Sequence, residues 1–178
     1  MDAAGPPESN RTDEQLVTAY RAGEPEAFEA LVRRYHPELF HFLARFVSNR
    51  AAAEDLFQEA FLQVHVSIHT FDPKRRFKPW LFTIAANKAR DYLRKNNRRQ
   101  SEQATVEDES DPSGRAILDL LETDLPLPSS EVEDAETRRR VRETIETLPD
   151  HLREVLLLAY FHQFAYKEIA SMLSVPLG

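Results

Sequence analysis

The sequence predicts an all-α protein made of two small helical domains joined by a flexible acidic linker. The chain has 178 residues, of which 42% are hydrophobic and only four are glycine, enough apolar material for the cores of small domains. Its apolar residues recur at spacings of three and four, as they do along one face of a helix. Alternating runs rich in valine and isoleucine, which are typical of strands, are scarce.

The N-terminal domain is expected to span residues 12–97, after a disordered tail at residues 1–11. Thr12 and Gln15 have the spacing of a capping box that starts the first helix. Proline opens two later helices at its favoured first-turn position. The expected helices cover about residues 13–22, 25–35, 39–47, 50–66 and 79–95. Each carries an apolar stripe, so together they predict one helical bundle.

The linker is expected at residues 98–130, where the composition turns polar and acidic. Between Glu102 and Glu136 there are twelve acidic residues and one basic residue. Prolines interrupt the segment, which cannot bury enough apolar area to fold alone. A short apolar island at residues 116–121 is expected to become helical on a partner. A second domain of short helices follows at residues 131–178.

The helix at about residues 50–66 carries a second organised stripe beyond the one that faces the core. A helix that only folds needs one apolar face, so a second pattern indicates a binding surface. This stripe mixes acidic and amide side chains with apolar ones, which suits protein docking better than DNA binding. On the pattern alone, a solvated face is an equally good interpretation. The members of the stripe are Asp55, Gln58, Glu59, Leu62 and Val66.

The segment from Lys74 to Arg99 is the candidate polyanion surface, because it holds ten basic residues and one acid in a chain of net charge −7. Arginine can pair with phosphate and asparagine with a base edge, and aromatic rings among cations suit single-stranded nucleic acid. A solvated basic helix with ordinary core aromatics is the alternative. The loop members are Phe71, Lys74, Arg75, Arg76, Phe77, Lys78 and Trp80. The helix members are Thr83, Asn87, Lys88, Arg90, Asp91, Arg94 and Arg98.

The C-terminal residues 166–178 have the pattern of the first helix and the turn of a helix-turn-helix. The small Ala170 allows a close helix crossing, and residues 174–178 supply the turn. The pattern predicts a recognition helix next, but the sequence stops at Gly178 before one. The helix members are Tyr166, Lys167, Ile169, Ala170 and Leu173.

Taken in order, these segments resemble the sigma factors of bacterial RNA polymerase, in the extracytoplasmic-function (ECF) group of the sigma-70 family. Residues 55–61 resemble the polymerase-docking motif of region 2. Residues 77–87 resemble its promoter-melting segment, and residues 90–94 its minus-ten-reading continuation. Residues 148–153 and 166–170 resemble region 4. The ordered set of motifs makes the solvated-face alternatives much weaker.

The resemblance implies a function and a set of partners. Region 2 would dock on core RNA polymerase. The basic loop and helix would then capture the non-template strand of the promoter minus-ten element, with a base flipped into a pocket. The linker would thread the polymerase channels. Because the recognition helix is missing, this sequence is expected to lack the minus-thirty-five contact. An anti-sigma factor that covers the docking faces is expected as a regulator.

Other classes of protein fit less well. His65 and His69 have a metal-binding spacing, but no phosphate loop, nucleophile motif or metalloprotease pattern accompanies them, so an enzyme is not expected. A helical protein-binding adaptor has no need of the basic stripe, and a conventional helix-turn-helix regulator has no need of a single-strand face before that motif. We expect no cofactor, no metal and no small-molecule substrate. The lack of cysteine, of a signal peptide and of a membrane-spanning run predicts a cytoplasmic protein without membrane insertion.

Overall fold

Helices account for all the regular structure in the part of the chain that the structure describes. A computed structural model describes residues 10–103 and 135–177, so most of the predicted tail and the island at residues 116–121 lie outside the described residues. The first group of elements comprises α1 (Asp13–Arg21), α2 (Pro25–Val47), α3 (Arg50–Ser67), the 3₁₀ turn η2 (Ile68–Thr70) and α4 (Phe77–Gln103). The second comprises α6 (Ala135–Glu146), α7 (Asp150–Leu156), the π-helical turn η3 (Leu157–Phe161) and α8 (Tyr166–Leu173). The all-α prediction is confirmed.

The first helix begins at the cap that the sequence predicts. The backbone N–H of Gln15 donates to Thr12 Oγ1 at 3.3 Å, and the N–H of Thr12 donates to Gln15 Oε1 at 2.8 Å. Both donors lie at a helix start, where they have no partner within the helix. Gly23 follows α1 with a φ of +100°, a conformation that glycine adopts without strain. This turn lets α2 begin at once and fold back on α1.

One continuous helix, α2, spans a region where the sequence predicts two helices separated by Pro37. Proline removes one backbone hydrogen bond and costs about 3 kcal/mol inside a helix. The packing on both sides of Pro37 offsets that cost, because Tyr35 and Leu39 are both buried and each such side chain contributes about 1.5–3 kcal/mol. The proline therefore sits within α2 and does not end it.

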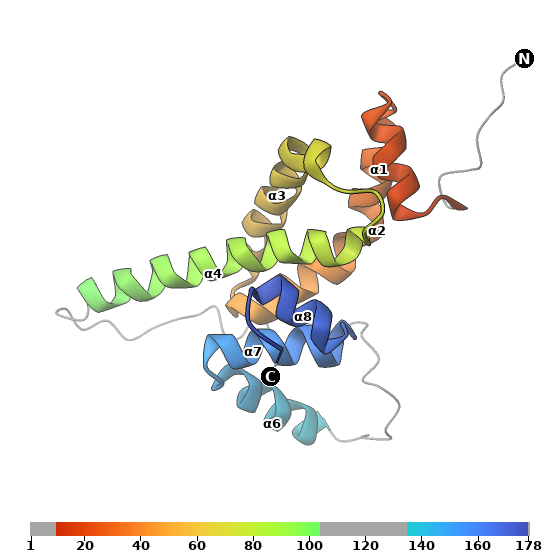
Figure 1. Cartoon of the computed structure of the whole chain (residues 1–178). Helices are drawn as coiled ribbons and strands as arrows, with labels where there is room; N and C mark the ends of the chain where they lie inside the picture. Colours follow the sequence, from red (N-terminus) through yellow and green to blue (C-terminus); the bar gives the residue numbers. More distant parts are fainter. Residues whose placement is uncertain (1–9, 104–134, 178) are drawn as a thin grey trace, which may run out of the picture.

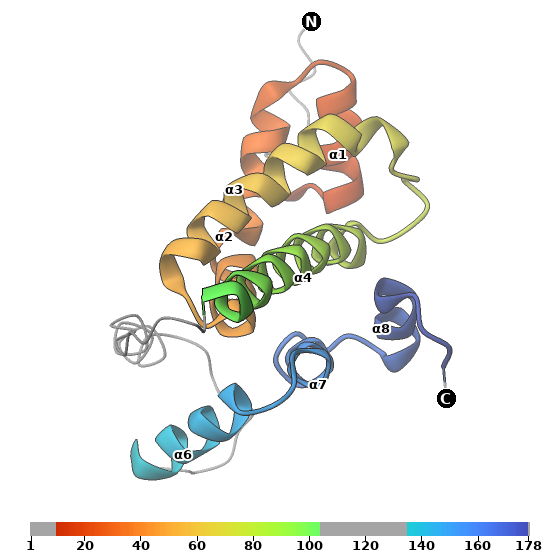
Figure 2. The same cartoon turned by 90° about the vertical axis from the view of Figure 1, so that its left-hand side faces the viewer.

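The long helix α4 joins the two groups of elements. In Figures 1 and 2 it runs between α2 and α3 on one side and α8 on the other. Phe82 on α4 is fully buried, with its ring centroid 5.3 Å from that of Phe42 on α2 and 5.2 Å from that of Phe164, which precedes α8. Helices distant in the sequence thus share one apolar centre.

The end of α4 lies further along the chain than the sequence indicates. The helix continues to Gln103, so residues 98–103, which the sequence places in the linker, are helical. In Figure 1 this end of α4 projects beyond the rest of the bundle. Most of the expected linker, at residues 104–130, lies outside the described residues.

Candidate functional site

The outer face of α3 exposes the whole stripe that the sequence predicts for docking. The side chains of Leu62 and Val66 are 63% and 58% exposed, beside the exposed Asp55, Gln58 and Glu59. Apolar side chains that stay in water next to polar ones are typical of a surface that a protein partner covers. The opposite face of the helix is buried and consists of Ala53, Leu56, Phe57, Ala60, Phe61 and Val64.

The loop that leads into α4 divides into a buried base and an exposed basic tip. Phe71 and Phe77 are 3% and 0% exposed, so their rings are not available to stack on bases in this arrangement. Both rings pack against Trp80, with centroids 5.1 Å and 5.8 Å away. Between them, Lys74, Arg75 and Arg76 are exposed, and Trp80 is partly buried. The two phenylalanines therefore support the loop, and the cations form its outer surface.

The polar stripe of α4 is exposed along its outer part. Asn87, Asp91, Arg94 and Arg98 are exposed, and Thr83 is partly buried. Within the stripe, Arg90 Nη2 donates to Asn87 Oδ1 at 2.5 Å, and Arg94 Nη2 donates to Asp91 Oδ1 at 2.5 Å. These bonds hold two guanidinium groups on one side of the helix, and a guanidinium group is suited to bidentate pairing with phosphate.

An ion pair joins the two predicted faces. Lys88 Nζ on α4 lies 3.5 Å from Glu59 Oε2 on α3. Glu59 belongs to the stripe predicted for protein docking, and Lys88 to the helix predicted for nucleic acid. The two surfaces are therefore neighbours on a continuous side of the bundle, so one partner complex can touch both.

Carboxylates from other helices pair with several of the predicted DNA-binding cations. Arg76 Nη1 lies 2.8 Å from Glu168 Oε1 on α8, and Arg90 Nε lies 3.5 Å from Glu154 Oε1 on α7. These contacts place the C-terminal helices against one flank of the α4 stripe. Sequence reasoning missed the two glutamates, because ion pairs between residues 64 to 92 positions apart leave no periodic signal.

A third carboxylate, Glu38 on α2, has two partners at the seam, which is the contact between the C-terminal helices and the α2–α4 side of the bundle. Its Oε1 lies 2.5 Å from Lys78 Nζ and 3.1 Å from His162 Nδ1. Burial lowers the pKa of His162, outweighing the bond to Glu38, so the neutral ring donates its Nδ1–H to the carboxylate. Burial raises the pKa of Glu38, but the bonds from His162 and Lys78 outweigh it and leave this pKa below its ordinary value. Among Glu38, Lys78 and His162, the charged pair is therefore Glu38 with Lys78.

The buried carboxyl of Glu154 behaves differently. Burial raises its pKa to about 7, with Arg90 opposing the shift. Its Oε1 makes no hydrogen bond, and the 3.5 Å separation from Arg90 is longer than a charge-assisted hydrogen bond. Glu154 is thus a titratable group in the seam that no sequence pattern singles out.

Arg153 ties the C-terminal helices to α2 through backbone carbonyls. Its Nη1 donates to Phe46 O at 3.1 Å, near the end of α2. Its Nη2 donates to Glu146 O at 2.8 Å and to Leu148 O at 3.0 Å, at and just beyond the end of α6. Carbonyls at helix ends have no partner within the helix, so one guanidinium satisfies acceptors from two helices.

The predicted helix-turn-helix residues lie on α8 as expected from their spacing. Ile169 is buried, Ala170 and Leu173 are partly buried, and Tyr166 and Lys167 are exposed. The side chain of Glu168 accepts from the N–H of Ala165 at 3.1 Å, which caps the start of the helix. The apolar side of α8 packs toward α4 and η3, and its polar side remains open.

Two negative observations concern residues 10–103 and 135–177 alone. None of the helices described there has both the length and the apolar composition needed to cross a bilayer. In the same residues, histidine, aspartate and glutamate side chains do not gather in threes that could hold a metal ion.

Comparisons with known proteins agree with this two-part architecture. Residues 31–99 match the family model of sigma-70 region 2, and residues 138–178 match that of sigma-70 region 4. The sigma factor CarQ of Myxococcus xanthus is 38% identical, over 89% of this chain and 83% of its own. The ECF sigma-E factor of Haemophilus influenzae is 33% identical, over 94% of this chain and 86% of its own.

Solved structures share the fold across both groups of helices. CnrH, in complex with the cytosolic domain of CnrY, is 25% identical with a TM-score of 0.63 over 92% of this chain and 84% of its own. The sigma factor RpoE of Bartonella quintana, in complex with the anti-sigma factor NepR, is 22% identical with a TM-score of 0.61 over 84% of both chains. The second likeness shows the fold alone.

The family models and the relatives identify the class of this protein as an RNA polymerase sigma factor. The chain belongs to the sigma-70 family, in its extracytoplasmic-function group. Proteins of this group are non-enzymatic transcription initiation factors that bind core RNA polymerase and promoter DNA.

Proposed function

We propose that this sigma factor divides its work between two neighbouring faces of the N-terminal bundle. The docking face on α3, which consists of Asp55, Gln58, Glu59, Leu62 and Val66, binds core RNA polymerase. The reading face binds the non-template strand of the minus-ten element. It consists of the basic tip at residues 72–76 together with Lys78, Trp80, Thr83, Asn87, Lys88, Arg90, Asp91, Arg94 and Arg98. The observation that carries the proposal is the exposure of Leu62 and Val66 on α3. The same helix carries Glu59, whose ion pair with Lys88 connects it to the cationic helix α4.

The reading face has the chemistry of single-strand capture. Exposed arginines neutralise phosphates, and the amide of Asn87 can hydrogen-bond a base edge. Trp80 offers a partly exposed ring for stacking. Phe71 and Phe77 take a supporting role in this proposal, because both are buried. Extruding one base costs a few kcal/mol, which stacking and hydrogen bonds in the pocket offset.

A charge placed in the docking face tests the polymerase contact. Leu62→Asp should weaken binding to core RNA polymerase by roughly ten-fold or more, because buried apolar anchors dominate interface energies. Gln63→Asp adds the same charge at the next position of α3, outside the stripe, and should bind nearly as well as the parent. Equal loss with both variants would contradict a localised docking face.

Neutral substitutions in the reading face test the DNA contact. Asn87→Ala and Arg94→Ala should each reduce minus-ten melting roughly ten-fold, since a good base or phosphate contact contributes about 1–3 kcal/mol. Polymerase affinity should stay within about two-fold of the parent. Arg33→Ala removes an exposed arginine on α2 and serves as the control. If both variants lost polymerase binding and melting together, a protein-binding adaptor would explain the chain better.

The remaining features of the proposal follow from this role. The chain works by binding and not by catalysis, in the cytoplasm, where RNA polymerase and its promoters are. In the C-terminal domain, Lys167 and Tyr166 on α8 stay open to further contacts with DNA or polymerase.

An anti-sigma factor that covers Leu62 and Val66 is the natural regulator, because these exposed apolar side chains favour a protein cover. The regulatory part is tested by co-purification: the parent chain should retain an inhibitor that the Leu62→Asp variant does not retain.

A further inference from the structure

Helix α1 holds both ends of the basic loop, although it contributes nothing to either proposed face. The loop tip at residues 72–76 is bounded by Phe71 and Phe77, whose buried rings lie 5.7 Å apart between centroids. The aromatic contacts fix where the two ends of the tip lie. They do not fix the backbone at those ends, where the carbonyl of Phe71 and the N–H of Phe77 have no partner within a helix.

Arg21, the last residue of α1, binds the first end of the loop. Its Nε donates to Ile68 O at 2.9 Å, and its Nη2 donates to Phe71 O at 2.5 Å. The planar guanidinium is suited to bridging two acceptors at once. One side chain therefore holds the carbonyl of η2 and the carbonyl just before the basic tip in a fixed relation.

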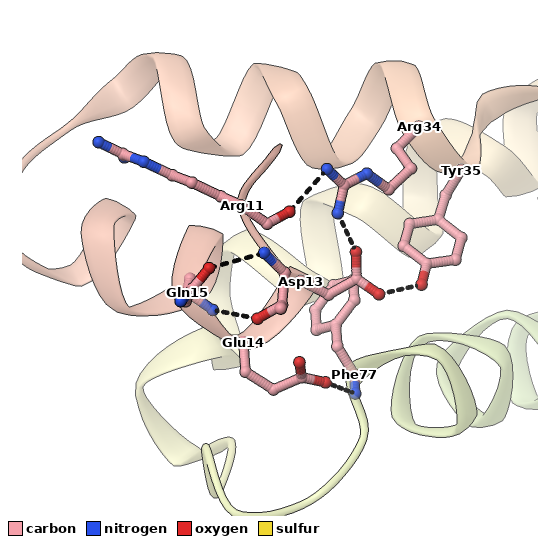
Figure 3. Close-up of polar contacts among 8 residues, drawn as sticks. Arg11, Asp13, Glu14, Gln15, Arg34, Tyr35 and Phe77 are labelled. Carbon is pink, nitrogen blue, oxygen red and sulfur yellow. Dashed lines mark hydrogen bonds and ion pairs between the residues drawn. The ribbon is translucent and has the colours of Figure 1, made fainter. Parts of the chain in front are cut away.

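Glu14, in the first turn of α1, binds the second end. Its Oε1 accepts a hydrogen bond from the backbone N–H of Phe77 at 3.0 Å, as Figure 3 shows. Phe77 is the first residue of α4, so the carboxylate satisfies a donor at the positive end of that helix. Glu14 and Arg21 are seven residues apart, which puts them on one side of α1, two turns from each other.

The tip between these two anchors is itself ordered by a local turn. Asp72 Oδ1 accepts from the N–H of Lys74 at 3.0 Å, and the N–H of Arg75 donates to Asp72 O at 2.9 Å. Short aspartate turns of this kind restrict the backbone without help from other helices. With both ends held and the middle turned, the tip cations have a defined position relative to α4.

We propose that Glu14 and Arg21 are positioning residues for promoter capture. They set the geometry between the basic tip at residues 72–76 and the reading face of α4, and neither touches DNA. A loop already in its bound geometry loses less conformational freedom on binding a strand, which raises affinity without a new contact. This inference rests on the proposed function, since it assigns α1 a task within the same site.

A neighbouring ion pair provides a control that distinguishes this role from ordinary support of the fold. Asp13 lies one residue before Glu14, and its Oδ1 is 2.6 Å from Arg34 Nη1 on α2 (Figure 3). This pair attaches α1 to α2, and neither of its residues is one of the two loop anchors. Arg34→Ala therefore weakens the attachment of α1 while leaving both loop anchors in place, and it is the matched control.

The test compares Glu14→Ala, Arg21→Ala, Glu14→Gln and Arg34→Ala in the full chain. Three quantities are measured: affinity for core RNA polymerase, permanganate reactivity of minus-ten thymines on a promoter selected with the parent chain, and the emission of Trp80. Trp80 is the chain's only tryptophan and packs against both Phe71 and Phe77. Its emission therefore reports the loop anchors without any DNA.

The expected results form a pattern that general destabilisation does not produce. Glu14→Ala and Arg21→Ala should shift Trp80 emission to longer wavelength and lower thymine reactivity per bound polymerase roughly ten-fold, with polymerase affinity within about two-fold of the parent. Glu14→Gln keeps an acceptor oxygen and should recover most of the activity. Arg34→Ala should lower the melting temperature of the protein and leave both loop readouts unchanged.

Two outcomes would overturn the inference. One is unchanged Trp80 emission in Glu14→Ala and Arg21→Ala, and the other is an Arg34→Ala variant that loses melting to the same extent as they do. If the parent chain fails to bind polymerase or to open any promoter, the proposed function fails. Trp80 emission still decides in that case whether α1 fixes the loop.

Discussion

At the scale of single residues, the buried hydroxyl of Tyr35 shows how polar groups shape the N-terminal bundle. Its O–H donates to Asp13 Oδ2 across α1 and α2. Burial first, and then the bond to Asp13, raise the pKa of Tyr35, so the phenol stays protonated at all ordinary pH values. The phenol therefore always has a proton to donate to Asp13.

Removing this hydroxyl should cost stability and nothing else. Tyr35→Phe leaves Asp13 without one donor and should lower the free energy of unfolding by about 1–2 kcal/mol, the usual effect of losing a hydrogen bond to a charged group. Urea denaturation measures the change. Tyr166→Phe, at a side chain that is 72% exposed, should be neutral. A neutral Tyr35→Phe would mean that water replaces the hydroxyl at no cost.

Glu154 predicts a pH dependence of the opposite sign to that of most carboxylates. Its pKa is raised to about 7 from 4.5, so the folded state binds its proton more tightly than the unfolded state. Its contribution to stability is therefore present below about pH 4.5 and is lost as pH rises through about 7, by up to about 3 kcal/mol. His162 acts in the other direction, because its lowered pKa removes stability as pH falls through the ordinary histidine range.

The variant Glu154→Gln isolates this group from the histidine. Between about pH 5 and 8 the parent should lose free energy of unfolding relative to Glu154→Gln, as measured by urea denaturation at several pH values. Gln163→Asn, which changes no titratable group at an exposed position, should give a difference that is flat with pH. A flat difference for Glu154→Gln as well would show that Glu154 remains ionised in the folded state.

At the scale of elements, periodic features were predictable and long-range ones were not. The Thr12–Gln15 cap and the two faces of α3 follow from spacings of three and four, because helical geometry places such residues together. The Glu14–Phe77 bond joins residues 63 positions apart, and no local pattern encodes it. The prediction that Pro37 separates two helices was wrong, because tertiary packing on both sides of the proline stabilises one continuous helix.

The end of α2 offers a prediction about a helix terminus. Ser48 follows Val47 with a φ of +52°, a left-handed conformation that favours glycine. Ser48→Gly should therefore raise the free energy of unfolding by about 0.5–1 kcal/mol, which thermal denaturation can measure. Ser171→Gly, inside α8, should lower it by a similar amount. A destabilising Ser48→Gly would show that the serine side chain contributes more than the strain costs.

At the scale of the whole molecule, the C-terminal helices pack against the reading face. The Arg76–Glu168 and Arg90–Glu154 pairs and the Phe82–Phe164 contact form this seam. Sequence reasoning found both parts and gave no sign of the contact between them, because it identified each part by its own periodicity. If the reading face binds DNA as proposed, the DNA strand and these carboxylates compete for the same cations.

Loosening the seam should expose the reading face. Phe164→Ala combined with Glu168→Ala should raise the radius of gyration measured by X-ray scattering. It should also strengthen binding of the free chain to a single-stranded minus-ten oligonucleotide several-fold, since each released arginine can then pair with phosphate. Ser171→Ala, on the same helix and exposed, is the control. An unchanged scattering profile with unchanged binding would contradict the competition.

The three carbonyl bonds of Arg153 carry a consequence for how this protein can change over time. Every residue has the same backbone carbonyl whatever its side chain is. Substitutions at positions 46, 146 or 148 therefore leave those acceptors in place. A change of side chain at any of the three accepting residues therefore does not by itself remove a hydrogen bond from Arg153. Of these bonds, only the bond to Phe46 O crosses from the C-terminal helices to α2, so a single substitution at position 153 removes that link between the two parts of the molecule.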